Sequence, residues 1–369
     1  MKAAMKGRAA VFTEKFKPFE FRELELPEVD PDGLIVRVTL ANICGSDVHA
    51  WEGKTPRHPF TILGHEMTGR VFRLGRNTTT DALGQPLKEG DRVVYTYWHP
   101  CFQCRDCLAG EPNLCLVKSA RAGRDRSDQW PYFTGAYADF FFLRRGHYAL
   151  KVPESLSDAA VAPINCALAE VLYGLHQAGT GLGDPVAIQG AGGLGIYACA
   201  VAKEMGCGPV VILDRLPDRL EMAKRFGADS CLNVDDFQTP EDRAAAVRGL
   251  TDGGPAVVLE VAGTPAVMKE GILMLRPRGT YVIIGNIMPG ETAEIDPTWF
   301  YLGAKRMIGL RGYEPWALRK SLDLLMNAKD KYPWDDLLSH TFPLAEITTA
   351  FQLSYERKVR RAAIAINAS

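Results

Sequence analysis

The sequence predicts an α/β protein of two domains: a β-rich domain formed by both ends of the chain, and a doubly wound parallel-sheet domain inserted between them. The chain has 369 residues, long enough for about two domains that each bury a core. Short strands and turns dominate the first part, whereas strands alternate with helices in the middle, as in βαβ units. We expect the β-rich domain to comprise residues 1–158 and 312–369, and the parallel-sheet domain residues 159–311.

The β-rich domain is predicted from three strand-like segments and one closing strand. Residues 33–44 (GLIVRVTLANIC) alternate in the manner of a half-buried strand. Residues 66–75 and 90–98 are two further segments rich in β-branched and aromatic residues, and a polar loop separates them. The strand at 361–366 (RAAIAI) lies near the end of the chain and could complete this domain. Glycine-rich β segments of this kind are typical of a compact β domain.

The parallel-sheet domain is predicted from the regular alternation that begins near Ser157, a plausible helix N-cap. A helical segment at 158–179 is followed by a strand at 185–189, a glycine turn and another helix. The pattern continues with a strand at 210–214, a helix at 217–228 and further strands at 256–263 and 279–286. Strands separated by helices of 10–15 residues indicate a parallel sheet.

Four cysteines form a compact cluster, which we expect to hold a lobe over residues about 99–116. They are Cys101, Cys104, Cys107 and Cys115 in CFQCRDCLAGEPNLC. This spacing lets a tight loop turn four sulfurs toward one tetrahedral zinc at roughly 2.3 Å, a closed and therefore structural site. The alternatives are a disulfide framework, which suits short secreted chains rather than one with nine cysteines, and an iron–sulfur cluster, whose runs often end in Cys-Pro.

A glycine turn predicts a dinucleotide site. The pattern G-x-G-x-x-G follows a predicted strand and precedes a helix, which is the context of the Rossmann fingerprint. The glycines allow the backbone to approach a pyrophosphate, whose charge is favoured at the helix N-terminus. The residues of this turn that we expect to bind cofactor are Gly190, Gly192, Gly193, Leu194 and Gly195.

Asp214 ends the next predicted strand and bears on the choice of cofactor. An acid there accepts hydrogen bonds from the adenosine ribose and repels a 2′-phosphate, which favours NAD over NADP. Arg215 and Arg219 follow closely and are also expected to contact the cofactor, since an arginine can accommodate that phosphate. A helix N-cap or a solvated turn acid is the alternative for Asp214.

A second, sparser set of candidate ligands suggests an open metal site. Cys44 begins the run C-G-S-D-V-H, and His65 and Glu66 follow about twenty residues later. A thiolate and an imidazole suit zinc, and a catalytic site needs a third ligand together with a free position. Cys166 is the best third candidate. Taken singly, each residue also fits an ordinary buried cysteine or a locally hydrogen-bonded histidine.

Together these motifs resemble the zinc-containing medium-chain alcohol dehydrogenase family, in the family's order and over nearly the entire chain. The resemblance implies a GroES-like catalytic domain and a Rossmann NAD-binding domain. It also implies one catalytic and one structural zinc per chain, and reversible oxidation of an alcohol to an aldehyde or ketone with hydride transfer to NAD. A homodimer or homotetramer, associated through the α/β domain, is implied as well.

The resemblance also implies roles for individual residues. Cys44, His65 and Cys166 correspond to the catalytic zinc ligands, and Glu66 to the acid that can approach the metal. Asp47 corresponds to the carboxylate that orients His65, and Ser46 with His49 to the proton relay. Tyr97 would fall in the substrate pocket, and Arg361 is a candidate for contact with the pyrophosphate.

Glu170 is a departure from the family pattern, because it stands where many relatives have a small hydroxyl residue. It lies four residues after Cys166, one helical turn away. Some polyol dehydrogenases of this family use a glutamate as the third zinc ligand. Glu170 could therefore replace Cys166 as a ligand, exchange with it, or meet a polar substrate.

Composition limits the other function classes. A net charge of −1 with scattered Lys and Arg argues against a nucleic-acid surface. We see no apolar run of 18 residues or more and no signal-peptide pattern, so we expect a cytoplasmic protein. Arg121, Arg124 and Arg126 could attract an anionic alcohol such as a phosphonate or carboxylate, and the alternative is that they belong to a solvated loop. The rival functions are a polyol dehydrogenase, a zinc-free quinone or enoyl reductase, and a non-catalytic zinc-stabilised relative.

Overall fold

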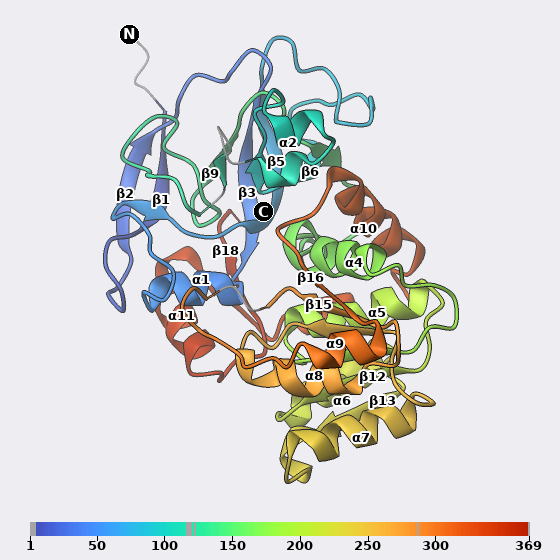
Figure 1. The fold of residues 1–369 in the computed structure, drawn as a ribbon. Helices are drawn as coiled ribbons and strands as arrows, with labels where there is room; N and C mark the ends of the chain where they lie inside the picture. The colour runs from blue at the N-terminus through green and yellow to red at the C-terminus, as the bar shows by residue number, and fades with distance from the viewer. Residues whose placement is uncertain (1–4, 116–119, 122, 286–287, 368–369) are drawn as a thin grey trace. The chain divides into compact units, whose positions relative to one another are not determined.

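The computed structural model describes residues 5–115, 120–121, 123–285 and 288–367 of the chain (Figure 1). Its contacts divide the chain into two compact units. Unit 1 contains Met1–Cys166, Glu314–Asn327 and Trp334–Ser369, and unit 2 contains Ala167–Tyr313 and Ala328–Pro333. Both ends of the chain therefore belong to unit 1.

Unit 1 is built on β-sheets. Its main sheet has the order β10-β6-β5-β3-β18-β17, with β9 also paired to β3, and a smaller sheet has the order β2-β1-β4. Most side chains of the central strand β3 are apolar and buried. The bounds of these strands and of the short pair β7-β8 are β1 Lys6–Phe12, β2 Glu20–Glu25, β3 Leu34–Asn42, β4 Thr61–Ile62, β5 Glu66–Leu74, β6 Arg92–Tyr95, β7 Trp98–His99, β8 Ala120–Arg121, β9 Phe140–Leu143, β10 Ala149–Lys151, β17 His340–Pro343 and β18 Ala362–Ala365.

Strands from the two ends of the chain meet in the main sheet. β18 pairs antiparallel with β3, with Ala363 opposite Asn42. Ile364, in the same strand, is fully buried. In Figure 1 the red C-terminal strand lies beside the blue N-terminal ones. The end of the chain thus completes the sheet in which β3 leads to Cys44 and β5 begins at Glu66.

Apart from α10, which has 13 residues, the helices of unit 1 are short, and α1 carries several candidate functional residues. The helix α1 is anchored by Trp51, whose ring is 6.1 Å from that of Phe351 and 6.2 Å from that of Tyr355, both in α11. Trp51 is 2% exposed, so this aromatic group fixes the end of α1 in the core. The bounds are α1 Gly45–Trp51, α2 Arg105–Leu108, α3 Asp158–Val161, α10 Pro315–Asn327 and α11 Ile347–Tyr355.

Unit 2 contains a six-stranded sheet in the order β13-β12-β11-β14-β15-β16, in which each described pairing is parallel. Its central strands are buried along their whole length, as expected where helices cover both faces of a parallel sheet. The strands are β11 Val186–Gln189, β12 Val210–Asp214, β13 Ser230–Asn233, β14 Val257–Glu260, β15 Thr280–Ile283 and β16 Arg306–Gly309. The helices are α4 Ala169–Gln177, α5 Gly193–Glu204, α6 Pro217–Arg225, α7 Pro240–Leu250, α8 Met268–Met274 and α9 Thr298–Gly303.

The order of strands reverses at β11, which pairs with β12 on one side and β14 on the other. Chain order runs outward from β11 through β12 and β13, and then returns through β14 to β16 on the other side. Ligands of open α/β sheets bind at the carboxyl ends of the strands where such a reversal occurs. The predicted fold class, α/β with a doubly wound parallel sheet, is confirmed, and the glycine turn follows the strand at the reversal.

One helical stretch in the described part of the chain, Asp158–Gln177, is long and apolar enough by length and composition to cross a membrane. Its apolar pattern is interrupted by the acidic residues Asp158 and Glu170, so the stretch does not form a continuous apolar run in the sequence. Of its most apolar window, 78% is buried inside the protein. Burial of this extent is what a core helix of a globular enzyme shows, and the stretch includes the turn that carries Cys166.

Candidate metal and cofactor sites

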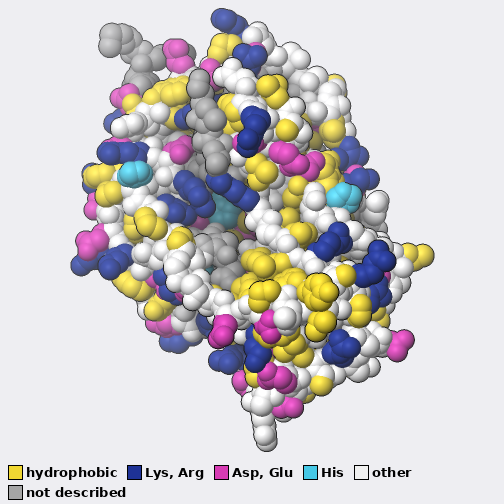
Figure 2. Space-filling view, in the orientation of Figure 1, with side chains coloured by type: hydrophobic (Ala, Val, Ile, Leu, Met, Phe, Trp, Pro, Cys, Tyr) yellow, Lys and Arg dark blue, Asp and Glu magenta, His cyan; other side chains and the backbone are white. Residues whose placement is uncertain are grey.

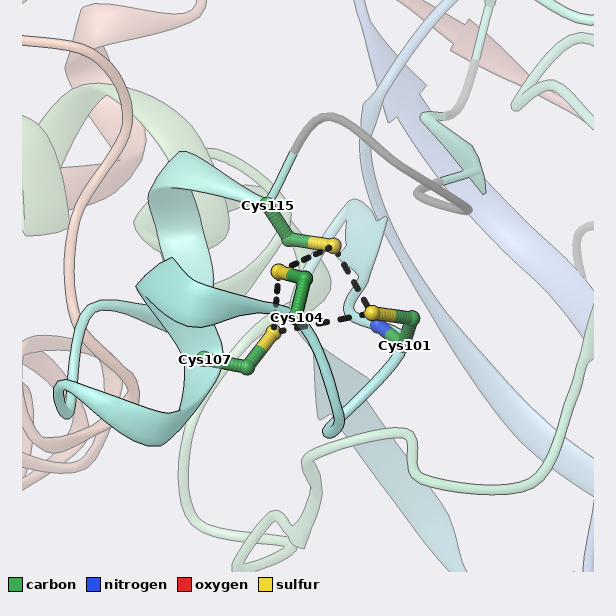
Figure 3. A group of neighbouring side chains, drawn as sticks. All are labelled: Cys101, Cys104, Cys107 and Cys115. Atoms are coloured by element: carbon green, nitrogen blue, oxygen red, sulfur yellow. Dashed lines mark hydrogen bonds between the residues drawn. The ribbon is translucent and has the colours of Figure 1, made fainter.

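The four lobe cysteines converge on one point (Figure 3). Cys104 lies at the N-cap of α2, Cys107 within α2, and Cys115 just after the 3-10 turn Pro112–Leu114. The sulfur of Cys104 is 3.5 Å from that of Cys107 and 3.8 Å from that of Cys115, and the sulfurs of Cys101 and Cys107 are 4.0 Å apart. Four sulfurs 2.3 Å from a central zinc would be separated by about 3.8 Å. The donor set and its spacing therefore fit a tetrahedral zinc.

Electrostatics also favours a cation in the lobe. Burial, together with hydrogen bonds between Cys107 and the thiols of Cys104 and Cys115, raises the pKa of Cys107 to about 12. A thiol in this position stays protonated unless a positive charge compensates its thiolate. A divalent metal supplies that charge, and coordination deprotonates the ligating thiols.

A second group brings together Cys44, His65, Glu66 and Cys166, whose ligand atoms all lie within 4.8 Å of one another. All four are buried, and all belong to unit 1. Cys44 is the N-cap of α1, His65 and Glu66 enter β5, and Cys166 lies in a π-helical turn, Ile164–Leu168. Cys166 Sγ is 3.3 Å from His65 Nε2. Two sulfurs, one imidazole nitrogen and a nearby carboxylate suit an open zinc site.

Asp47 orients two of these candidate ligands. Its Oδ1 is 3.2 Å from His65 Nδ1, which leaves Nε2 directed to the cluster. Its Oδ2 accepts hydrogen bonds from the backbone N–H of Cys44 at 3.0 Å and from the Tyr137 hydroxyl at 3.1 Å. This carboxylate is 5% exposed. Metal-bound imidazoles generally have such a partner, which fixes the ring and its tautomer.

Asn165 fixes the position of Cys166, a role that was not predicted from the sequence. Its side-chain amide donates to the carbonyl oxygen of His65 at 3.0 Å and to that of Tyr95 at 3.1 Å. Asn165 is fully buried. A polar residue beside Cys166 in an otherwise apolar segment was the available signal, but its partners are 70 and 100 residues away in the chain.

The surroundings of the cluster favour a negatively charged Cys44 thiolate and a positively charged His65 imidazole. A hydrogen bond from Cys166 lowers the pKa of Cys44 well below its ordinary value, against the effect of burial. Burial lowers the pKa of His65, but the charge and hydrogen bond of Asp47 outweigh burial and raise it well above the ordinary value. A cysteine that readily forms a thiolate, next to an oriented imidazole, is prepared to bind a metal.

Glu66 is fully buried beside these ligands and is held by Arg361. The Arg361 guanidinium donates to Glu66 Oε2, and in the described structure Glu66 Oε1 has no hydrogen-bond partner. Burial raises the pKa of Glu66 to about 7, although Arg361 opposes the shift. Arg361, proposed from the sequence as a pyrophosphate contact, thus meets the carboxylate next to the candidate ligands.

The remaining predicted residues of unit 1 are Ser46, His49 and Tyr97, and two of them contact this group. The Ser46 side chain hydrogen-bonds the Cys44 thiol. His49 Nδ1 is 2.6 Å from Glu52 Oε1, a partner that the sequence analysis missed. The Tyr97 ring meets the His65 ring edge-on at 5.1 Å and is 9% exposed. Glu170 is in α4 of unit 2 and is not a member of the four-residue group.

The glycine turn of unit 2 has the geometry that close approach to a pyrophosphate requires. Gly190 has a φ of +103°, a conformation that other residues rarely adopt. A Cβ on Gly195 would lie 1.8 Å from the carbonyl oxygen of Gly190, so only glycine fits there. By contrast, a Cβ on Gly192, the N-cap of the 12-residue helix α5, would meet nothing within 4 Å. The open backbone at the helix N-terminus fits a phosphate group.

Asp214 is hydrogen-bonded to this turn, which the sequence alone could not reveal. Its Oδ2 accepts from Ala191 N at 2.7 Å, and its Oδ1 accepts from Arg215 N at 2.8 Å and Leu216 N at 3.0 Å. A carboxylate offers about four acceptor positions, so capacity for a ribose hydroxyl remains. Arg215 lies 3.5 Å from Asp235 at the surface, and Arg219 is in the first turn of α6.

A buried polar network supports the strand that leads into the glycine turn. Gln189, the last residue of β11, donates to Val267 O at 2.8 Å and to Glu270 Oε1 at 3.1 Å, and accepts from the Tyr281 hydroxyl at 2.9 Å. Gln189, Glu270 and Tyr281 are at most 2% exposed. This network was not predicted, although a glutamine at the end of an apolar strand was its signal.

Comparisons with known proteins agree with this arrangement. Residues 30–154 match the family model described as alcohol dehydrogenase GroES-like domain, and residues 193–327 match that described as zinc-binding dehydrogenase. The chain is 34% identical over 357 residues to 5-exo-hydroxycamphor dehydrogenase of Pseudomonas putida, covering 94% of this chain and 95% of the relative.

Solved structures are similar over nearly the whole chain. An alcohol dehydrogenase of Thermotoga maritima has a TM-score of 0.91 at 28% identity, over 98% of this chain and 99% of the other. A Sinorhizobium meliloti protein described as a zinc-binding dehydrogenase, bound to NADP, has a TM-score of 0.85 at 27% identity, over 98% and 100% of the two chains. The chain therefore belongs to the zinc-binding medium-chain alcohol dehydrogenase family and is a zinc-dependent alcohol dehydrogenase with a nicotinamide cofactor.

Proposed function

We propose that Cys44, His65 and Cys166 hold a catalytic zinc, that the four lobe cysteines hold a structural zinc, and that the enzyme transfers hydride to NAD. The observation that carries the proposal is the convergence of the ligand atoms within 4.8 Å, with Asp47 on the opposite nitrogen of His65. Glu170 is the alternative third ligand, and the 3.3 Å approach of Cys166 Sγ to His65 Nε2 favours Cys166.

The residues around the site divide the chemistry between them. When bound, zinc supplies a Lewis acid that lowers the pKa of an alcohol, and the nicotinamide supplies the hydride acceptor. Ser46 would take up the alcohol proton and pass it to His49, whose ring is held by Glu52 at 2.6 Å. Tyr97 would confine the substrate against the His65 side of the site. Arg361 would hold Glu66 close to the metal without requiring it to be a permanent ligand.

The choice of NAD over NADP rests on Asp214. Its negative charge lies at the end of β12, linked to the glycine turn through Ala191 N. A 2′-phosphate placed beside this carboxylate would be repelled, whereas a ribose hydroxyl could donate to it. Arg215 is placed where an arginine could attract the 2′-phosphate of NADP. Asp235 lies 3.5 Å from its guanidinium, however, and offsets part of that positive charge. The proposal predicts that kcat/KM is higher for NAD than for NADP, and steady-state kinetics with both cofactors measures the two values.

We further propose a homo-oligomer that associates through unit 2. Strand β16 is the edge of the six-stranded sheet, and its residues are mostly exposed. Beside it in the sequence, Tyr301 and Leu302 of α9 are 84% and 81% exposed. Figure 2 shows hydrophobic side chains gathered over α9. An open edge next to an apolar patch suits a partner subunit. Light scattering of the purified protein, with Leu302→Glu as the variant, tests this.

A cytoplasmic location is proposed from the thiols. All nine cysteines are free. Six of them belong to the two candidate metal sites, where coordination requires the reduced form. A reducing compartment maintains that form. A thiol count on protein purified under anaerobic conditions, before and after metal removal, checks the redox state.

A further inference from the structure

Asn42 is a fully buried polar residue at the end of β3, two residues before Cys44. In the described structure, neither polar atom of its side chain, Oδ1 or Nδ2, has a hydrogen-bond partner. Its main chain is engaged, since the Tyr137 hydroxyl lies 3.0 Å from Asn42 O and 3.1 Å from Asp47 Oδ2. Burial of a side-chain amide is costly unless the amide is hydrogen-bonded, so this amide requires a partner close to the candidate metal ligands.

Strand pairing places Asn42 beside Glu66. In the antiparallel ladder of β3 and β5, the two residues lie directly opposite each other. Side chains at directly opposite positions project from the same face of the sheet, with Cβ atoms about 4.5–5.5 Å apart. At this separation the amide of Asn42 can reach the carboxylate of Glu66.

The strand on the other side of β3 brings Arg361 to the same face of the sheet (Figure 1). Asn42 is opposite Ala363 in β18, and Arg361 precedes Ala363 by two residues. Side chains two residues apart in an extended chain project from one face. The bond from the Arg361 guanidinium to Glu66 Oε2 agrees with this placement. Asn42, Glu66 and Arg361 therefore share one face of the main sheet.

The two oxygens of Glu66 differ in their partners. Oε2 accepts from Arg361, whereas Oε1 has no hydrogen-bond partner among the described residues. Glu66 also belongs to the group whose ligand atoms lie within 4.8 Å of one another. A carboxylate oxygen with unused lone pairs at that distance would compete with an alcohol for the position on zinc that a catalytic site keeps open.

We propose that Asn42 is a positioning residue for Glu66: in the zinc-loaded enzyme Asn42 Nδ2 donates to Glu66 Oε1 while Arg361 binds Oε2, and the fourth zinc position stays open to the alcohol. The inference rests on the proposed catalytic zinc. The two side chains are complementary, since Nδ2 is a buried donor and Oε1 a buried acceptor, each without another described partner. A hydrogen bond to a charged acceptor is also stronger than one between neutral groups.

Imidazole binding to the cobalt-substituted enzyme tests this role without turnover. Co²⁺ in place of zinc gives visible absorption bands, and only an open site can take imidazole as a further ligand, so a band that shifts with imidazole reports the catalytic site rather than the closed lobe. Asn42→Leu has a similar volume and no donor. It should weaken imidazole binding by about tenfold or more, because Glu66 then competes for the open position. Asn42→Ala, which cannot overpack the site, should have the same effect.

A second substitution and a matched control make the result specific. Adding Glu66→Gln to Asn42→Leu should restore imidazole binding, since the competing carboxylate is gone. Thr68→Val is the control, because Thr68 is also fully buried in β5 and its hydroxyl donates to Val93 O at 2.9 Å. It should lower Tm without changing imidazole binding.

The outcomes separate this inference from the proposed function. If both Asn42 variants bind imidazole as the wild type does, or if Glu66→Gln does not restore the binding that Asn42→Leu weakens, the role of Asn42 is overturned and the metal site stands. If imidazole shifts no cobalt band in the wild-type protein, the proposed open metal site fails, and the role of Asn42 fails with it.

Discussion

Asp47 is the residue on which the preorganisation of the candidate catalytic site depends. One of its oxygens faces His65 Nδ1, and the other accepts from Cys44 N and the Tyr137 hydroxyl. Two candidate ligands are thus fixed by a single buried carboxylate. A site held in this way loses little entropy when metal binds, because its side chains are already confined.

Asp47→Asn should weaken metal binding at the catalytic site by about ten- to a hundredfold, since the loss of an outer partner of a ligating histidine typically has this effect. The measurement is a competition titration with a chelator, in which lobe and catalytic metal are followed separately. Asp81→Asn is a matched control: Asp81 is also 5% exposed and accepts backbone N–H groups, from Leu83, Gln85 and Lys151. It should change stability without weakening metal binding, and equal effects of the two variants would contradict the role of Asp47.

Asp214→Asn should lower the ratio of kcat/KM for NAD to that for NADP by tenfold or more. The amide removes the charge that repels a 2′-phosphate and weakens the acceptor offered to the ribose, and hydrogen bonds to charged groups contribute about 1.5–3 kcal/mol. Asp235→Asn, at the exposed partner of Arg215, is the control for a general change of charge. Steady-state kinetics with both cofactors check the prediction, and an unchanged ratio would remove Asp214 from cofactor selection.

At the residue scale, the candidate metal ligands could be predicted from the sequence, whereas the residues that hold their surroundings in position could not. Cys44, His65 and Cys166 were proposed because their motifs resemble a family, and the structure brings their ligand atoms together. Asn165, Glu52 and Gln189 were missed. The roles of Asn165 and Gln189 depend on partners that only folding makes adjacent, as with the bond from Asn165 to His65 O across 100 residues. Glu52 is different, because its partner His49 is only three residues away.

The glycine turn is the element whose sequence most directly predicts a binding site. Its strand, turn and helix were predicted from the motif and its context, and unit 2 contains β11, the turn and α5 in that order. The helix begins at Gly193, within the motif itself rather than after it. The last glycines of the motif therefore belong both to the glycine turn and to the first turn of α5. The residue types alone do not show where the loop ends and the helix begins.

Gly195→Ala should prevent normal cofactor binding, because the added Cβ would lie 1.8 Å from Gly190 O and must displace the turn. We expect the Kd for NADH to rise by a hundredfold or more and stability to fall by about 1–3 kcal/mol, the usual cost of overpacking. Gly249→Ala is the matched control, since a Cβ there meets nothing within 4 Å and Gly249 lies in α7. That variant should be as stable or more stable by about 0.5–1 kcal/mol. NADH fluorescence titration and thermal unfolding distinguish the two variants.

Strand pairing shows what the sequence could not predict at the element scale. Alternation indicated β3 as a half-buried strand, but its neighbours β5, β9 and β18 come from distant parts of the chain. Local patterns carry information on which residues form a strand, whereas pairing is decided by packing between segments. The regular alternation of unit 2 is more predictable, because βαβ units connect neighbouring strands with one handedness.

At the scale of the whole molecule, the lobe should contribute to stability rather than to chemistry. Its four cysteines come from one short segment whose secondary structure is limited to α2 and one 3-10 turn. Such a segment has few means of holding its fold other than a metal.

Cys104→Ser should therefore lower Tm by about 5 °C or more, since loss of a structural metal removes folding free energy and each kcal/mol shifts Tm by about 2–4 °C for a domain of this size. Cys231→Ser is the control, because Cys231 belongs to neither metal-ligand group and its thiol donates to Leu220 O. Differential scanning calorimetry measures both. A Cys104→Ser protein as stable as the control would contradict a structural role for the lobe.

The metal content of the purified protein tests the central claim most directly. Elemental analysis of the wild-type protein should find about two zinc ions per chain, one in the closed lobe site and one in the open catalytic site. Cys166→Ser should retain about one and lose alcohol oxidation, whereas Cys231→Ser should retain two together with full activity. A Cys166→Ser protein that keeps two zinc ions and full turnover would contradict the assignment of Cys44, His65 and Cys166 as the catalytic ligands.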